Sequence, residues 1–399
     1  MNYIELAEKY GTPLYVYDSQ KIINNYDRFV QSFDVSNLKL HYAVKALSNI
    51  SILKLMKSIG AGLDCVSIQE VQLGLRAGFP AKDIIFTPNS ISEEEYEKAL
   101  ELGVKMNIDN LQILEYFGVN HPSEPICIRV NPHLMAGGNK NISVGHIDSK
   151  FGISIHQMPL VKRLIKNYGI PVEGIHVHTG SDILDPEIFI RASELIFAIA
   201  EEMDDLKYLD FGSGFKVKYK KDGMDTNIKK FGQLFGDKFN EFCSETGKEL
   251  ELRFEPGKYL VSESGAFLAK VNIIKQTTSC TFLGLDTGFN HLIRPMLYDA
   301  YHEIENISNP DGERKLYTVV GYLCETDTFG SDRILSEVRK NDILRFHNAG
   351  AYCFAMSSNY NSRYKPAEVL LHKGEDYLIT QRENFDDLVR NQTDPGIDF

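Results

Sequence analysis

Short β-prone runs of apolar residues recur through the first two thirds of the chain, separated by stretches with helical periodicity. The stretches at 50–58, 93–102 and 157–167 are amphipathic at helical spacing. Strands that alternate with helices are typical of a parallel sheet, and eight such units can close into a barrel. The pattern therefore predicts an α/β fold, with a (β/α)8 TIM-like barrel over residues 20–262. The predicted barrel strands are 38–44, 62–66, 84–87, 104–108, 126–130, 174–178, 206–211 and 250–254.

Polar or glycine residues follow each of these runs. In a (β/α)8 barrel the strand ends converge on one face, and active sites lie there. A single polar residue after a strand is an ordinary loop or capping residue. Eight in succession, with lysine, histidine and glutamate among them, favour the rim of an active site. They are Lys45, Ser67, Asn89, Asp109, Asn131, His178–Ser181, Gly212–Gly214 and Glu255.

The pattern changes after about residue 262, where strand-like segments continue with fewer helical intervals. We predict an all-β domain formed by residues 1–19 and 263–399. The β-like segment at 12–17 precedes the barrel, and we expect it to pair with the C-terminal sheet. The predicted strands of this domain are 267–274, 281–285, 316–320, 342–346, 368–371 and 376–380.

Composition narrows the class of protein. The chain has 399 residues, 43% of them hydrophobic, and a formal net charge of -12. These values exclude wholesale disorder and argue against a nucleic-acid surface, because the densest basic cluster is the short segment 216–221. The start does not resemble a signal peptide, and no run approaches the roughly 20 apolar residues of a membrane span. The scattered cysteines lack metal-site spacing, so we expect a soluble cytoplasmic protein whose cysteines are reduced.

Lys45 and a pair of histidines are the first candidates for chemistry. Lys45 ends a mostly apolar strand, where partial desolvation lowers a lysine pKa and suits Schiff-base chemistry. A surface lysine is the plain alternative. His176 and His178 are two residues apart, so a strand would point both to one face, where one could stack on a flat heteroaromatic ring. Core histidines or a metal pair are the alternatives, and the metal pair lacks a third ligand at motif-like spacing.

A glycine-rich turn and a glutamate complete a possible cofactor site. The backbone N–H groups of Gly212–Gly214 could hold a phosphate. An ordinary tight turn without a ligand is the commoner explanation of such a sequence. Glu255 at the barrel mouth could pair with a pyridinium N–H, or could form a structural salt bridge. Together with Lys45, His178 and Ser181, these residues fit pyridoxal phosphate.

Cys324 is the candidate acid in the second domain. It lies beside Glu325 and close to Asp327, so a proton-donor role is possible, and a plain thiol is the alternative.

These stretches, in this order, resemble the fold-type III pyridoxal-phosphate decarboxylases, most closely those that act on diaminopimelate. The resemblance runs from residue 11 to residue 369. It implies a barrel plus a β-domain, and a head-to-tail homodimer in which Cys324 and Glu325 reach the other subunit's cofactor. The family-like stretches are 42–46, 62–67 with Glu70, 129–132, 149–153, 176–181, 255–257, 294–298, 324–325 and 350–352.

The resemblance also implies residue roles. Lys45 would hold the cofactor covalently and Cys324 would return a proton to the substrate carbon; no metal is expected. Lys258 stands where the family usually has arginine, and Ser213 where a glycine is common. The implied cofactor contacts are Lys45, Asp64, His178, Ser181, Gly212, Gly214, Glu255, Pro256, Gly257, Lys258 and Tyr352. The implied substrate contacts are Lys258, Arg294, Tyr298, Glu325 and Tyr352.

The implied reaction is decarboxylation of meso-2,6-diaminopimelate to L-lysine and CO2, the last step of lysine biosynthesis. Each end of this substrate carries an amine and a carboxylate, and Arg294 with Glu325 would suit the distal end. A same-fold decarboxylase of carboxynorspermidine, ornithine or arginine is the nearest alternative. A racemase-like isomerase and a regulatory homologue without activity are more distant ones.

Overall fold

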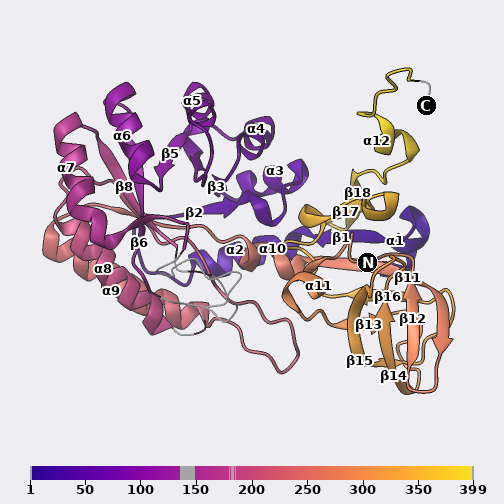
Figure 1. Cartoon of the computed structure of the whole chain (residues 1–399). Helices are drawn as coiled ribbons and strands as arrows, with labels where there is room; N and C mark the ends of the chain where they lie inside the picture. The colour runs from indigo at the N-terminus through magenta and orange to yellow at the C-terminus, as the bar shows by residue number, and fades with distance from the viewer. Residues whose placement is uncertain (1, 135–148, 179, 181–183, 185, 398–399) are drawn as a thin grey trace. The chain divides into compact units, whose positions relative to one another are not determined.

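The computed structural model describes residues 2–134, 149–178, 180, 184 and 186–397, and it divides into two compact units (Figure 1). The barrel unit comprises Ile23–Lys218 and Asp222–Leu260. The β unit comprises Met1–Ile22, Tyr219–Lys221 and Val261–Phe399. In the described part of the chain, no helix combines the length and apolarity needed to cross a membrane.

The barrel unit is a closed ring of eight parallel strands, as the sequence predicts. Each strand pairs with the next, and the pairing of the last strand with the first closes the ring. A short ninth strand, β7 (Ile153–Ser154), pairs beside β6. The ring strands are β2 (Leu38–Ala43), β3 (Gly62–Cys65), β4 (Ile84–Phe86), β5 (Lys105–Ile108), β6 (Ile126–Asn131), β8 (Val172–Val177), β9 (Tyr208–Asp210) and β10 (Glu251–Phe254).

The two faces of these strands differ in polarity. One face carries fully buried apolar side chains such as Leu40, Ile128 and Leu252. On the other face, the register aligns Arg129 with His176 and His176 with Asp210. Because ladder partners share a face, this polar row lies on one side of the sheet and the apolar row on the other. The polar face continues toward the strand ends, where the site residues lie.

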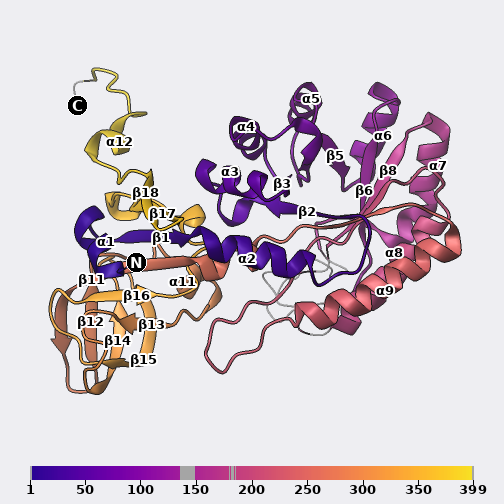
Figure 2. The same ribbon diagram turned by 180° about the vertical axis from the view of Figure 1, so that it is seen from behind.

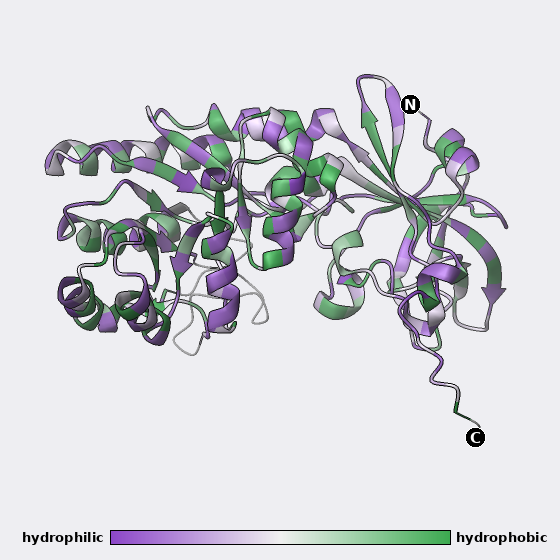
Figure 3. Cartoon of the chain, turned by 90° about the horizontal axis from the view of Figure 1, so that it is seen from above, coloured by the Kyte–Doolittle hydropathy of each residue, from purple (hydrophilic) through white to green (hydrophobic). Residues whose placement is uncertain are grey.

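Helices surround the barrel strands (Figures 1 and 2). Most contain both hydrophobic and hydrophilic residues, as amphipathic helices require (Figure 3). Asn49, Ser67 and Asn110 cap three of them, each accepting a backbone N–H of the first turn. The helices are α2 (Ser19–Val30), α3 (Ile50–Ser58), α4 (Ile68–Arg76), α5 (Glu93–Glu101), α6 (Leu111–Asn120), α7 (Met158–Tyr168), α8 (Pro186–Glu201), α9 (Ile228–Thr246) and the short α10 (Lys258–Val261).

The β unit is built on a second sheet, in which the N-terminal strand lies between C-terminal strands. Strand β1 (Leu14–Asp18) pairs antiparallel with β11 and parallel with β17, so the expected pairing of this segment with the C-terminal sheet is confirmed. The other strands are β11 (Gly265–Gln276), β12 (Thr281–Leu285), β13 (Ile304–Asn306), β14 (Arg314–Val320), β15 (Thr328–Ser336), β16 (Ile343–Phe346), β17 (Ala367–His372) and β18 (Glu375–Thr380).

The β unit is dominated by its sheet, as the predicted β-domain requires. The short helices in its described part are α1 (Tyr3–Tyr10), α11 (Arg294–Tyr298) and α12 (Phe385–Val389). Helix α1 forms because Asn2 caps it, and Leu6 and Ala7 pack into a buried cluster with residues of β1, β11 and β17. That cluster is part of the core of this unit.

Candidate active site

Lys45 lies in a single 3-10 turn, Val44–Ala46, directly after β2. Its neighbours Val44 and Ala46 are fully buried, whereas the Lys45 side chain is 44% exposed. The Nζ atom is 4.0 Å from Oδ2 of Asp64, a buried carboxylate on β3. The turn therefore presents an accessible amine beside a buried negative charge.

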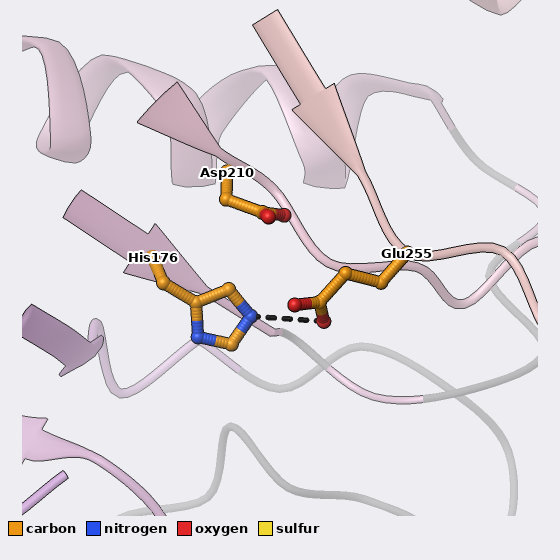
Figure 4. A group of neighbouring side chains, drawn as sticks. All are labelled: His176, Asp210 and Glu255. Carbon is orange, nitrogen blue, oxygen red and sulfur yellow. Dashed lines mark hydrogen bonds and ion pairs between the residues drawn. The ribbon is translucent and has the colours of Figure 1, made fainter. Parts of the chain in front are cut away.

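Three adjacent strands bring His176, Asp210 and Glu255 together inside the barrel (Figure 4). His176 Nε2 is 3.1 Å from Glu255 Oε2, and one ligand atom of each residue lies within 4.8 Å of the others. From the sequence alone, Asp210 has no assigned role and His176 no assigned partner. The period-2 alternation of the strands is the signal that could have placed both residues on the face that leads to Glu255.

Burial dominates the electrostatics of this group. It raises the pKa of Glu255 to about 8, with the Asp64 carboxylate adding to the effect. Burial also raises the pKa of Asp210 to about 7, and the nearby Glu255 charge makes the second largest contribution to this rise. The same burial lowers the pKa of His176 to about 4, so its imidazole is neutral near pH 7. The group thus holds two carboxyls that resist ionisation until a cationic partner arrives.

Two carboxyl oxygens of the group are buried without a hydrogen-bond partner among the described residues. They are Glu255 Oε1 and Asp210 Oδ2. Leaving such an atom unsatisfied costs about 1–3 kcal/mol. A ligand with a protonated ring nitrogen would supply the missing donor at Glu255, which fits a pyridinium better than a purely structural ion pair.

His178 follows β8 and contacts the glycine turn. The strand ends at Val177, so the alternation argument does not extend to this histidine. Its Nδ1 accepts the backbone N–H of Ser213 at 3.1 Å, which leaves the ring proton on Nε2. Burial lowers the pKa of His178 well below its ordinary value, and the charge of Lys45 adds to the effect. The result is a neutral, flat ring held in a fixed orientation.

The turn after β9 is held close to His178 and Glu255. Gly212 has a φ of 59° and Gly214 a φ of 132°, whereas the φ of Ser213 is not positive. A Cβ on Gly212 would lie 2.6 Å from His178 Nδ1, so only glycine fits there. Gly212 also donates its N–H to Asp210 Oδ1 at 2.9 Å and accepts the Glu255 N–H at 2.6 Å. The turn and the carboxyl pair therefore form one hydrogen-bonded assembly.

The remaining cofactor candidates of the barrel unit follow Glu255. Pro256 and Gly257 are buried, and a Cβ on Gly257 would lie 3.1 Å from the Cβ atoms of Ala43 and Ala46. This close approach seats the segment against the turn that carries Lys45. Lys258 begins α10 and is half-buried. Ser181 lies outside the described residues.

Two charged residues, the half-buried Glu70 and the buried Arg129, carried no role in the sequence analysis, although both lay in family-like stretches. Glu70 Oε2 accepts the Val66 N–H at 2.8 Å, and burial raises the pKa of Glu70 to about 7. Arg129 on β6 is buried, with its guanidinium 4.8 Å from the Phe151 ring. The Arg129 charge affects the pKa of His178 and of Glu255, and the charges of Asp64 and Lys45 affect the pKa of Glu70.

The substrate candidates of the second domain, other than the barrel residue Lys258, come from several segments of the β unit. Arg294 begins α11 and is buried, and Tyr298 ends the same helix half-buried. Tyr352 is half-buried and has φ of 55°.

Cys324 and Glu325 are exposed on the loop between β14 and β15. Glu325 Oε1 accepts the Tyr360 hydroxyl at 2.8 Å. Asp327 is buried, and its carboxylate accepts the N–H groups of Phe289 at 2.7 Å and Leu323 at 2.9 Å. Asp327 therefore shapes the loop that presents Cys324.

Comparison with known proteins gives these groups a context. Residues 19–262 match the family described as pyridoxal-dependent decarboxylase, pyridoxal binding domain. The diaminopimelate decarboxylase of Methanothermobacter thermautotrophicus is 38% identical over 98% of this chain and 94% of its own length. That of Campylobacter jejuni is 36% identical over 98% of both chains. The crystal structure of the Helicobacter pylori diaminopimelate decarboxylase complexed with L-lysine matches with a TM-score of 0.89 and 32% identity, over 98% of both chains.

Proposed function

The chain belongs to the pyridoxal-dependent decarboxylases, and we propose that it converts meso-2,6-diaminopimelate to L-lysine and CO2 with pyridoxal phosphate. The observation that carries this proposal is the full-length similarity to diaminopimelate decarboxylases. The accessible amine of Lys45 and the buried Glu255 Oε1, which has no hydrogen-bond partner among the described residues, support it. Residues 20–262 would bind the cofactor. Residues 1–19 and 263–399 would carry the substrate and dimer-interface residues.

The barrel group suits the parts of pyridoxal phosphate. Lys45 supplies the amine for its aldehyde, and Glu255 Oε1 the acceptor for its ring N–H. His178 offers a flat neutral ring as a stacking surface. The N–H groups of the Gly212–Gly214 turn and the Ser181 hydroxyl would take the phosphate. Asp64, Pro256, Gly257, Lys258 and Tyr352 complete the proposed contacts.

The bound cofactor supplies an electron sink for the pair of electrons that CO2 leaves behind. The chain's own residues manage the protons. Glu255, with Asp210 close to it, concentrates negative charge where the ring nitrogen must stay protonated, and His176 holds the other Glu255 oxygen. Cys324, on its exposed loop, returns a proton to the carbon that lost CO2.

The distal end of the substrate needs both a cation and an anion from the protein. Arg294 suits the distal carboxylate and Glu325 the distal amine, with Lys258, Tyr298 and Tyr352 as further contacts. A substrate without the distal carboxylate would leave the buried guanidinium of Arg294 poorly matched, at a cost of about 1–3 kcal/mol. The exposure of Cys324 and Glu325 suits a homodimer in which each subunit completes its partner's site.

We also propose a cytoplasmic location, which suits six cysteines that are all free.

Release of CO2 by the purified, cofactor-loaded protein tests the function directly. The comparison set is meso-diaminopimelate, ornithine, arginine and carboxynorspermidine at equal concentration. We expect CO2 and L-lysine from meso-diaminopimelate, with far slower release from the other three. Faster turnover of any of those three would overturn the assignment of substrate. No release of CO2 from any of the four compounds would overturn the assignment of activity.

A further inference from the structure

The basic segment at 216–221 is the densest cationic cluster of the sequence, and the proposed reaction gives it no role. Its last three residues, Tyr219–Lys221, group with the β unit although the chain on both sides belongs to the barrel unit. Lys220 Nζ lies 4.9 Å from the centre of the Tyr301 ring, and Lys221 Nζ is 2.9 Å from Glu303 Oε1. These two contacts fix the segment along residues 301–303.

Tyr219 thereby packs against Arg294. The centre of its ring is 4.6 Å from the Arg294 Cζ atom, within the range of a cation–π interaction. The same ring meets His302 edge-on at 5.4 Å. The Tyr219 hydroxyl is 3.1 Å from Ser262 Oγ, which fixes the far end of the side chain.

His302 holds the guanidinium from a second direction. Its side chain is fully buried, with Nδ1 2.9 Å from the carbonyl oxygen of His347 and Nε2 3.0 Å from Arg294 Nη1. A carbonyl can only accept, so Nδ1 carries the proton and Nε2 accepts from Arg294. Burial lowers the pKa of His302 to about 3, and the Arg294 charge adds to the effect, so the ring is neutral.

We propose that His302 and Tyr219 are positioning residues that orient Arg294 for the distal carboxylate of the substrate. This inference rests on the proposed function. A guanidinium recognises a carboxylate through a planar fork, so the orientation of its plane decides the strength of the pair. The hydrogen bond that Arg294 donates to His302 and the ring face of Tyr219 together restrict the orientation of that plane. The basic segment then has a purpose, which is to bring Tyr219 to Arg294.

The inference predicts a selective loss of affinity. Decarboxylation at one end of diaminopimelate leaves L-lysine with the amine and carboxylate of the other end, whereas cadaverine carries amines only. A misdirected Arg294 should therefore weaken diaminopimelate and lysine, and leave cadaverine unchanged. The chemical step is remote from this contact, so KM should change and kcat should not.

The test compares paired variants of the cofactor-loaded enzyme. His302→Leu removes the acceptor, whereas His302→Gln keeps an amide oxygen there. Tyr219→Leu removes the ring face, whereas Tyr219→Phe keeps it. His291→Gln is the control, because His291 is an equally buried histidine of the β unit that is hydrogen-bonded to Thr287. Each variant is measured for kcat and KM with meso-diaminopimelate, and for inhibition by L-lysine and by cadaverine.

We expect the two leucine variants to raise KM and the lysine inhibition constant about tenfold, a change of about 1.4 kcal/mol. Their kcat should stay within about twofold of wild type, and cadaverine inhibition should not change. The Gln and Phe variants and the His291→Gln control should behave like wild type. If one leucine variant fails to fold, the leucine variant at the other position still decides the question.

Unchanged KM and lysine inhibition in both leucine variants would overturn the inference. So would an equal weakening of cadaverine, since that indicates a general structural role. A wild-type enzyme that does not decarboxylate diaminopimelate would overturn the proposed function and this inference together. An active wild type with unaltered variants would overturn the inference alone.

Discussion

His176 offers a sharp test of how the barrel prepares Glu255 for the cofactor. In His176→Leu, the 3.1 Å contact between Nε2 and Glu255 Oε2 is lost, while Oε1 already lacks a partner among the described residues. A hydrogen bond to a charged group contributes about 1.5–3 kcal/mol. Without it the Glu255 pKa, already raised to about 8, should rise further. Because a pyridinium needs the ionised carboxylate, each additional pKa unit weakens cofactor binding about tenfold.

The assay is a titration of the cofactor-free protein with pyridoxal phosphate. The chain contains no tryptophan, so binding is followed by the absorbance of the bound cofactor or by calorimetry. We expect the dissociation constant to rise about tenfold or more in His176→Leu.

His41→Leu is the matched control. His41 is also a buried histidine of the barrel, but its charged neighbours are the cations Arg253, Lys39 and Lys105. This control should lose stability without losing cofactor affinity. An unchanged dissociation constant in His176→Leu, or an equal rise in His41→Leu, would refute the reasoning.

Three other predictions test separate parts of the site. Lys45→Ala should abolish turnover and the absorption band of the bound cofactor while leaving the melting temperature within a few degrees, because the side chain is 44% exposed; retained turnover would contradict its role. Gly212→Ala should lower both cofactor affinity and stability, because the added Cβ would lie 2.6 Å from His178 Nδ1. The control Gly247→Ala, with similar φ and open space around it, should cost only about 1–2 kcal/mol of stability. Equal cofactor affinity in both variants would count against phosphate binding by the Gly212–Gly214 turn. The melting temperature of the cofactor-free protein should fall as the pH rises from about 6.5 to 8. The pKa values of Glu255 and Asp210 are raised, so the folded state binds more protons than the unfolded state. A pH-independent melting temperature, or an Asp210→Asn variant whose pH profile is as steep as that of wild type, would contradict this.

The barrel is predictable from sequence because each of its strands is a short apolar run followed by a polar residue. The predicted runs and the observed strands agree to within a few residues, as with 62–66 against Gly62–Cys65. The β unit is harder to predict. Strand β15 carries Gly330 and a positive-φ Asp332, and its register with β14 shifts twice, so the alternation that identifies a strand is broken. Helix α1 is short and depends on its cap and on packing against distant strands.

The candidate site shows the same limit. Residues with distinctive chemistry, such as Lys45 and Glu255, stand out from the sequence itself. Their supporting partners do not, because they come from other strands or from distant segments. His176 meets Glu255 across 79 positions, and Tyr219 meets His302 only because a loop of the barrel sequence folds with the β unit. Such partners become visible only when the topology is known.

The central claim is that this chain decarboxylates one end of meso-diaminopimelate and holds the other end unchanged. The most direct measurement is to run the reaction in deuterated water and to analyse the lysine that forms. We expect L-lysine with a single deuterium on the carbon that lost CO2, delivered by an exchangeable acid such as the Cys324 thiol, and none on the α-carbon. Deuterium on the α-carbon, or a product other than lysine, would contradict it.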